Sequence, residues 1–177
     1  MSVCIPVYNG ERWLRDAIES VLGQTRRDFE LLIVDNRSSD GSLEVAADAA
    51  RRDDRVRVVE NVATIGAVPN HNRCLQLAQG DLVKFLHHDD LLRDDCLERM
   101  AAVLEDNSSV ALVFSRREIL LDDPADPAAQ QWKREHEVLT RASGAWTRST
   151  TGACYSAGTC RPLVSPSSRT GSASRPR

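Results

Sequence analysis

The sequence lacks the signals of several protein classes. Its five cysteines show no C-x-x-C spacing, no run of residues is long and apolar enough to cross a membrane, and no basic targeting segment precedes the first apolar run. An odd number of cysteines without a secretory signal is typical of reduced thiols. We therefore expect a cytoplasmic protein, and we leave open its peripheral association with the inner face of a membrane.

Two phosphate-binding motifs are also missing. No G-x-G-x-x-G follows the first apolar run, which argues against a dehydrogenase-type dinucleotide site, and no G-x-x-x-x-G-K-[ST] is present, which excludes a P-loop. A nucleotidyltransferase with a similar sheet needs a glycine-rich, basic loop after its first strand. Tyr8-Asn9-Gly10-Glu11 is not such a loop, so that class is the weakest alternative.

Charge is unevenly distributed along the 177 residues. Residues 141–177 carry six arginines and no lysine, aspartate or glutamate, so the first 140 residues hold 17 basic and 26 acidic residues. An acidic body gives no reason to expect nucleic acid as a partner. The hydrophobic content of 41% and the charged content of 28% are those of an ordinary soluble globular protein.

Apolar runs of strand length alternate with segments of helical period. We predict strands at 2–7, 29–35, 55–60, 81–86 and 110–115, with a short strand at 118–121, and helices at 11–22, 42–52, 69–79 and 93–106. Pro69 should lie in the first turn of its helix and Gly80 just past the end. This alternation predicts an α/β fold with a mostly parallel sheet flanked by helices. Cys4, Cys74 and Cys96 lie in apolar patterns and should be core residues.

The chain divides by composition into three parts. Residues 1–121 form the predicted α/β domain, residues 122–140 form a second region with a loop at 122–131 and a helix at 132–139, and residues 141–177 form a tail. Twenty of the 37 tail residues are Ser, Thr, Gly or Pro, a composition typical of disorder. We expect the tail to be disordered, or to result from premature termination or a shifted reading frame in the gene.

Polar residues follow three of the predicted strands. Because the carboxyl ends of parallel strands share one edge of a sheet, these residues should converge on one crevice. Pro6 has no N–H and should lie where strand pairing stops. The converging groups are Pro6, Tyr8 and Asn9 after the first strand, Asp35 and Asn36 after the second, and His87, His88, Asp89 and Asp90 after the fourth.

The segment His87-His88-Asp89-Asp90 has the chemistry of a metal site. Two adjacent carboxylates repel each other unless a cation or solvent compensates. Carboxylate oxygens suit Mg²⁺ or Mn²⁺, ions that usually bind together with phosphates. The alternative is a solvated turn that caps the next helix.

Taken in order, these motifs resemble one known family. The blocks are Val3-Cys4-Ile5-Pro6-Val7-Tyr8-Asn9, Leu32-Ile33-Val34-Asp35-Asn36, Ser38-Ser39-Asp40-Gly41-Ser42, Gly66 with His71-Asn72, Ala78-Gln79-Gly80-Asp81 and Phe85-Leu86-His87-His88-Asp89-Asp90. Over residues 1 to 120 the chain is similar to the inverting family 2 glycosyltransferases of GT-A fold. The resemblance implies a Rossmann-like nucleotide-diphospho-sugar fold and a role in building bacterial surface polysaccharide.

The resemblance also implies a site and a reaction. A sugar would pass from a nucleotide-diphosphate donor, expected to be UDP-linked, to the hydroxyl of a saccharide or lipid-linked acceptor, with inversion and with a divalent cation, Mn²⁺ or Mg²⁺. Asp35 would accept a hydrogen bond from the base. The nucleotide site would comprise Pro6, Tyr8, Asn9, Asp35, Asn36, His71 and His88, and the metal site would comprise Asp89, His87 and Asp90.

The chain departs from the family pattern at several points. His87 replaces the usual first Asp of the D-x-D motif, Asn36 replaces a frequent second Asp, and His71 replaces a frequent Arg. An imidazole suits Mn²⁺ better than Mg²⁺. Inverting transfer also needs a general base, and no catalytic residue is singled out among Asp122, Asp123, Glu135 and Glu137.

Other readings of the same residues stay open. Tyr8 can be a partly buried aromatic at a strand end, Asp35 and Asp40 can be helix caps, and His88 reads more readily as a supporting residue than as a direct ligand. The whole chain can also be a truncated, catalytically inactive nucleotide- and metal-binding module of the same fold.

Overall fold

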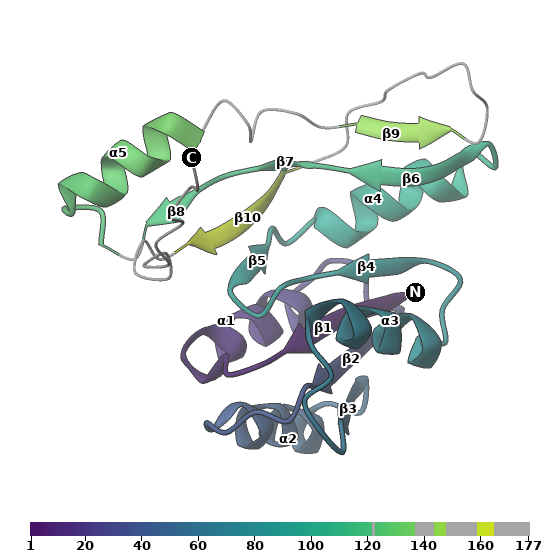
Figure 1. Cartoon of the computed structure of the whole chain (residues 1–177). Helices are drawn as coiled ribbons and strands as arrows, with labels where there is room; N and C mark the ends of the chain where they lie inside the picture. The colour runs from purple at the N-terminus through teal and green to yellow at the C-terminus, as the bar shows by residue number, and fades with distance from the viewer. Residues whose placement is uncertain (122, 137–143, 148–158, 165–177) are drawn as a thin grey trace, which may run out of the picture.

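A four-stranded parallel sheet forms the main part of the molecule. The computed structural model describes residues 1–121, 123–136, 144–147 and 159–164. Strands β1 (Ser2–Val7), β2 (Glu30–Asp35), β3 (Val56–Glu60) and β4 (Val83–Phe85) pair in the order β3-β2-β1-β4. Helices α1 (Glu11–Leu22), α2 (Ser42–Arg52) and α3 (Ala67–Leu77) join them (Figure 1). The predicted α/β class is confirmed.

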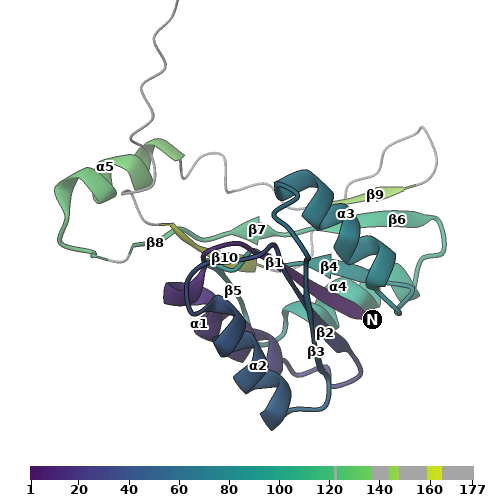
Figure 2. The same ribbon diagram turned by 60° about the horizontal axis from the view of Figure 1, so that its bottom comes forward.

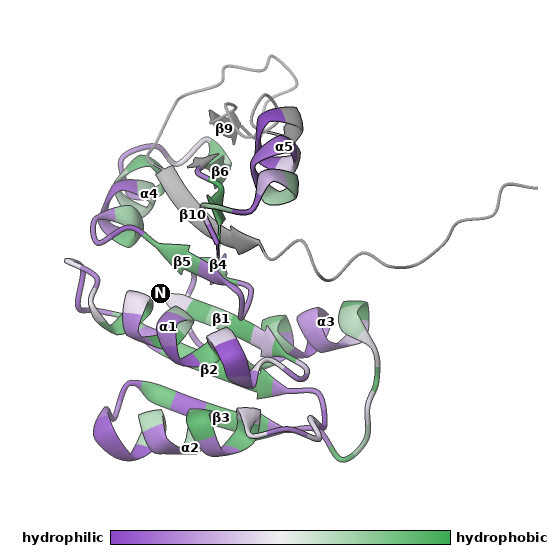
Figure 3. Cartoon of the chain, turned by 90° about the vertical axis from the view of Figure 1, so that its left-hand side faces the viewer, coloured by the Kyte–Doolittle hydropathy of each residue, from purple (hydrophilic) through white to green (hydrophobic). Residues whose placement is uncertain are grey.

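The two faces of the sheet are covered by different helices. Successive side chains of a strand point to opposite faces, so β1 places Val3, Ile5 and Val7 in one apolar cluster with α1, α2 and α4 (Cys96–Glu105), and Cys4 in another with Cys74 of α3. Figure 2 shows α3 on the opposite side of the sheet from α1 and α2. Every residue of β1 is buried, and Figure 3 shows hydrophobic residues along β1 and β2.

Three predicted elements have the predicted bounds, and α3 does not. The hydrophobic patterns of β1, α1 and α2 predict both ends of each element correctly. Helix α3 begins and ends two residues earlier than expected, and Pro69 is its third residue. The first helical hydrogen bond runs from Asn70 N to Gly66 O (3.1 Å), so Pro69 has no N–H bond to lose. Gly80 does not cap the helix. A Cβ there would lie 2.7 Å from Met1 Cα, so this glycine lets the chain pass the first residue.

Further elements lie beyond β4. These are β5 (Asp90–Leu92), α4, β6 (Val110–Phe114), β7 (Arg116–Arg117), β8 (Leu120–Leu121) and α5 (Pro127–His136). Strand β5 was not expected, because three residues carry no measurable period. The predicted loop at 122–131 is wrong from Pro127 onward. Asp126 caps α5 by accepting from Ala128 N (2.9 Å), and Pro127 occupies the first helical position, which suits its fixed φ.

Two segments of the predicted tail form strands. Strand β9 (Gly144–Thr147) pairs antiparallel with β6, and β10 (Thr159–Val164) pairs with β5, β7 and β8. The prediction of disorder is therefore wrong for these two segments. Backbone groups of neighbouring strands supply the hydrogen bonds, so neither segment needs an apolar period of its own. The rest of 141–177 lies outside the described residues.

Three cysteines are buried free thiols, as expected. They are Cys4, Cys74 and Cys96. Cys4 faces Cys74, and the hydrogen bond between them, together with burial, raises the pKa of the Cys4 thiol. Among the helices that the structure describes, none is long and apolar enough to cross a membrane.

Candidate functional site

The strand order places a topological switch point between the carboxyl ends of β1 and β4, where the sequence predicts a crevice. From β1 the chain runs through α1, β2 and α2 to β3, and then α3 crosses the other face and returns it to β4, on the far side of β1. The connection that leaves β1 therefore lies on one face of the sheet, and the connection that enters β4 lies on the other. Ligands of open α/β sheets bind at such a switch point.

Pro6 marks the place where β4 separates from β1. Pairing between these strands runs from Ser2 to Cys4, and its last hydrogen bond joins Leu86 N to Cys4 O (3.0 Å). Backbone groups two residues apart point to the same side of a strand, so the absent N–H of Pro6 would face β4 just past this point. The prediction that pairing stops at Pro6 is confirmed for this neighbour. The Pro6 ring itself is buried.

The loops after β1 and β2 are tied together. Ser38 Oγ accepts from Asn9 N (3.0 Å), Asn9 Oδ1 accepts from Ser39 N (2.9 Å), and Ser42 Oγ accepts from Gly10 N (2.8 Å). Asn9 has a φ of 51°, a left-handed conformation that asparagine tolerates better than most residues. One role of Asn9 is therefore to fix the backbone at this edge of the sheet.

Asp40 anchors the same pair of loops. Its carboxylate accepts from Glu11 N (3.1 Å), Ser42 N (3.0 Å) and Ser42 Oγ (2.5 Å). Burial acts to raise the pKa of this carboxyl, but these hydrogen bonds outweigh it and the pKa is lowered. The bonds join the first residue of α1 to the first residue of α2. Asp40 thus accepts one N–H at the start of each helix, although the N-cap positions are Gly10 and Gly41.

Tyr8 and Asp35 differ in exposure at the mouth of the crevice. Tyr8 is 49% exposed, whereas Asp35 is fully buried and accepts from Ser38 N (2.9 Å) and Ser38 Oγ (2.5 Å). A carboxylate has about four lone-pair positions, so Asp35 keeps acceptor capacity beyond Ser38. The structure thus gives Asp35 a structural role and leaves its predicted contact with a base as a prediction.

Asn36 belongs to a buried asparagine triad with Asn61 and Asn70. Asn61 Nδ2 donates to Asn36 Oδ1 (3.2 Å) and to Asn70 Oδ1 (2.8 Å), and Asn70 Nδ2 donates to Val34 O (3.0 Å). Asn36 Oδ1 also accepts from Ile65 N (2.9 Å). The triad ties β2, the loop after β3, and α3 together. The sequence analysis missed Asn61 and Asn70, since nothing in their local sequence shows that they are buried.

The predicted histidines come from two segments, α3 and the turn after β4. The ring of His71, on α3, lies with its centroid 5.5 Å from that of His87 and 5.2 Å from that of Phe85. His88 instead packs against the loop after β1, because a Cβ on Gly10 would lie 2.4 Å from His88 Cδ2. The packing of His88 agrees with its interpretation as a supporting residue.

The proposed metal ligands stand on a tight turn between β4 and β5. Asp90 N donates to His87 O (3.1 Å), His87 is exposed, and Asp89 and Asp90 are half-buried. Within the described part of the chain, no three His, Cys, Asp or Glu side chains are grouped closely enough to enclose a metal ion. The donor set of imidazole and carboxylate fits Mn²⁺, but it needs further ligands, such as phosphate oxygens.

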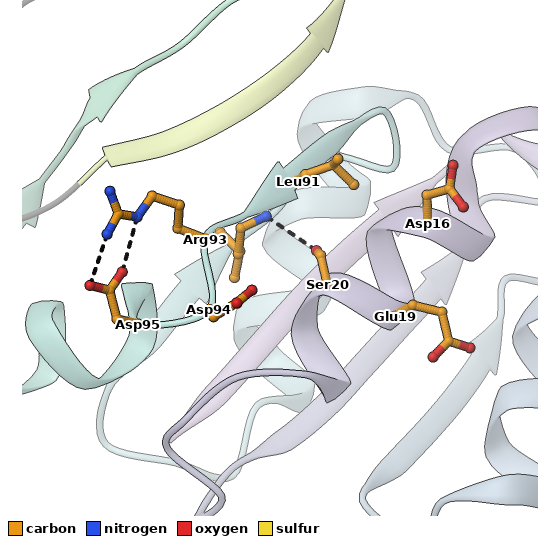
Figure 4. Close-up of a pocket in the computed structure, with 8 residues that line it drawn as sticks. Asp16, Glu19, Ser20, Leu91, Arg93, Asp94 and Asp95 are labelled. Carbon is orange, nitrogen blue, oxygen red and sulfur yellow. Dashed lines mark hydrogen bonds and ion pairs between the residues drawn. The ribbon is translucent and has the colours of Figure 1, made fainter.

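A separate cleft lies between α1 and the segment that joins β5 to α4. Its volume is about 790 Å³, and Figure 4 shows acidic side chains from both sides. Arg93, on its wall, pairs with Asp95 (3.1 Å). A cleft so rich in carboxylates repels a diphosphate, which favours the crevice at the strand ends for an anionic ligand. The lining residues are Asp16, Glu19, Ser20, Leu91, Leu92, Arg93, Asp94 and Asp95.

The structure places one of the four candidate base side chains. Asp123 is exposed and accepts from Ala125 N (2.8 Å). Asp122 and Glu137 lie outside the described residues, as does the side chain of Glu135. We assign none of these residues as the base.

Comparison with known proteins identifies the family. The model of glycosyl transferase family 2 matches residues 2–163. The chain belongs to this family. An uncharacterized Mycobacterium tuberculosis protein, MT1568, is 37% identical over 70% of this chain. TuaG of Bacillus subtilis, whose name is that of a teichuronic acid biosynthesis glycosyltransferase, is 32% identical, also over 70% of the chain. The family 2 chain spans 38% of MT1568 and 48% of TuaG.

Solved structures confirm the GT-A fold of this family 2 chain. Staphylococcus aureus TarS in complex with UDP-GlcNAc matches with a TM-score of 0.58 and 23% identity, over 71% of this chain and 36% of that one. The Pyrobaculum calidifontis mannosyltransferase PcManGT, in complex with GDP-Man and Mn²⁺, matches with a TM-score of 0.59 and 24% identity, over 65% of this chain and 34% of that one.

Proposed function

We propose that this chain binds a nucleotide-sugar donor and transfers its sugar to an acceptor hydroxyl with inversion. The observation that supports the proposal is the strand order, since Tyr8, Asp35 and the His87–Asp90 turn lie at the carboxyl ends of β1, β2 and β4, which are neighbours in the sheet. Membership of family 2 and the fold shared with TarS and PcManGT support it. We propose UDP as the nucleotide, in line with the complex of TarS.

In this proposal, some residues contact the base of the donor and others hold the surrounding loops in place. The exposed ring of Tyr8 offers a stacking surface for the base, and Asp35 offers a carboxylate oxygen to a base N–H. Asn9 and Asp40 hold the two flanking loops in place. Pro6, Asn36 and His88 support this edge from within, and His71 faces it from α3.

A divalent ion is part of the proposal. Asp89, with His87 and Asp90, would hold it against the diphosphate, and such an ion supplies Lewis-acid neutralisation of the charge on the departing nucleoside diphosphate. The acceptor, a saccharide or a lipid-linked sugar, and a location in the cytoplasm or at the inner membrane face belong to the same proposal. TuaG supports a place in polysaccharide synthesis.

A second candidate is a nucleotide- and metal-binding module without transferase activity. It is kept because inverting transfer needs a general base and no base is assigned among the described residues. Both candidates require the same donor site, so donor binding is tested first and sugar transfer second.

The test is calorimetric titration of UDP into the purified chain, with and without Mn²⁺, with GDP and dTDP as alternatives. We expect Mn²⁺-dependent binding that weakens more than about tenfold in Asp89→Asn, since a lost metal ligand typically costs at least 1.4 kcal/mol. Asp81→Asn is the matched control, because Asp81 is exposed at the opposite end of β4.

The outcomes separate the candidates. Binding followed by transfer to an acceptor supports the enzyme, and binding without donor hydrolysis or transfer supports the module. If none of the three nucleotides binds, or if Asp81→Asn weakens binding as much as Asp89→Asn, the donor-site proposal fails.

A further inference from the structure

Two histidines from different segments face each other beside the crevice. His71 is on α3, and His87 follows β4. Their ring centroids are 5.5 Å apart and their planes are inclined by 55°. Two imidazoles on one ion, with metal–nitrogen bonds of about 2.1 Å, hold their centroids roughly 5 Å apart. The observed separation therefore lies within reach of joint coordination.

The hydrogen bond of His71 selects which of its ring nitrogens can bind a metal. Nδ1 lies 2.8 Å from Ala67 O, and a carbonyl oxygen only accepts, so Nδ1 carries a proton. In the neutral ring, Nε2 then holds the lone pair. Metal-binding histidines usually donate their other ring N–H to a carbonyl or carboxylate in this way. The Phe85 ring, 5.2 Å from His71 between centroids, packs against the imidazole.

We propose that His71 Nε2 and His87 together bind a divalent transition-metal ion, such as Mn²⁺ or Zn²⁺, in preference to Mg²⁺. The preference follows from the ligands, because imidazole suits transition metals and Mg²⁺ prefers oxygen. The proposal deepens the proposed function, on which it rests for the role of the ion. It moves His71 from the nucleotide site to the metal site.

This arrangement has a consequence for affinity. Two imidazoles leave at least two positions of a four-coordinate ion to other ligands, which the diphosphate of the donor and water can supply. The ion should therefore bind weakly to the chain alone and more tightly once UDP is present. Because coupling is reciprocal, the ion should raise the affinity of the chain for UDP by the same factor.

The test follows the histidine side chains of the folded chain directly. The chain has four histidines, and ¹⁵N NMR distinguishes their ring nitrogens. On titration with Zn²⁺ alone we expect the Nε2 signal of His71 and a ring-nitrogen signal of His87 to shift together, while Mg²⁺ leaves both in place. Calorimetry with Zn²⁺ should show affinity reduced about tenfold or more in His71→Gln and in His87→Gln. His136→Gln, on α5, is the matched control.

The proposal is overturned if Zn²⁺ moves neither signal or only one of them, or if both variants bind Zn²⁺ like the unchanged chain. The NMR titration needs no variant, so a misfolded His71→Gln does not obscure the result. UDP binding measured by calorimetry with Mn²⁺ separates the two proposals. If the chain binds UDP but shows no histidine shifts, only the proposal of the histidine site is overturned. If it shows the shifts but does not bind UDP, only the proposal of the donor site is overturned.

Discussion

Gly10 is a residue whose lack of a side chain leaves room for His88 to pack against it. A Cβ at this position would lie 2.4 Å from His88 Cδ2 and 3.0 Å from Val7 Cγ2. We expect Gly10→Ala to displace His88 and to destabilise the chain by about 1–3 kcal/mol, the usual cost of overpacking. Urea denaturation measures the change. Gly23→Ala is the comparison and should cost less than Gly10→Ala, because its nearest new contact is longer, 3.2 Å to Glu19 O. Equal stability of the two variants would contradict this packing.

Asn70 and Asn72 are two asparagines of one helix with opposite surroundings. Asn70 is 3% exposed and bonds to Val34 O and Asn61, whereas Asn72 is exposed. Asn70→Ala should cost about 1–3 kcal/mol, because it leaves buried polar groups without partners, and Asn72→Ala should cost less than about 0.5 kcal/mol. Thermal unfolding of both variants checks the difference. Similar losses would mean that the triad adds no stability.

These asparagines also show which kind of residue could not be predicted from the sequence. Tyr8, Asn9, Asp35 and the His87–Asp90 turn were predicted because each follows an apolar run directly, and strand ends are readable from pattern. Asn61 and Asn70 carry no such signal, since their burial depends on α3 packing over β2. The meeting of His71 with His87 was missed for the same reason: it joins segments that only the tertiary fold brings together.

At the scale of elements, the turn between α2 and β3 is held by an ion pair. Arg55 Nη2 donates to Asp53 Oδ2 (2.7 Å), and Arg55 Nε and N both donate to Asp53 Oδ1 (3.0 Å each). The side-chain bonds from Arg55 are the main cause that lowers the pKa of Asp53 to about 2, against the opposing effect of burial. Asp53 thus joins the end of one element to the start of the next.

The lowered pKa predicts how stability changes with pH. The folded-state pKa lies below the ordinary value of 3.8, so the stabilisation is complete above about pH 4 and is lost as the pH falls toward 2. Asp53→Asn should lower the free energy of unfolding at pH 7 by on the order of 1 kcal/mol, with the difference shrinking toward pH 2. Urea titrations at several pH values test this, with exposed Asp54→Asn as control. A difference independent of pH would argue against the ion pair.

Elements were predicted well where a long hydrophobic period defines them. They were predicted poorly where pairing with a distant strand defines them. Helix α1 repeats buried Leu14, Ala17, Ile18 and Val21 at helical spacing, and its bounds follow. Strand β5 spans three residues and pairs with β10, far along the chain. The start of α5 was readable after all, since Asp126-Pro127 is a cap followed by a first-turn proline.

For the whole molecule, burial predicts an order of local stability. Strand β1 is buried throughout and β2 nearly so, whereas β6 has exposed residues at its centre. Amide hydrogen exchange under native conditions should therefore be slowest in β1 and β2, at the free energy of global unfolding, and faster in β6 through partial opening. Equal protection of β1 and β6 would show that the molecule opens only as one unit.

The strand order also determines when the strands of the sheet can pair during biosynthesis. Strand β1 pairs with β2 on one side and with β4 on the other, and Cys4 meets Phe85 across the second pairing. A ribosome adding about 5–20 residues per second needs roughly 4–16 s to make the intervening segment. Throughout that interval one edge of β1 has no strand to pair with, and unpaired edges invite association with other chains. The strand order that creates the switch point therefore also makes the nascent chain most vulnerable to aggregation until β4 emerges.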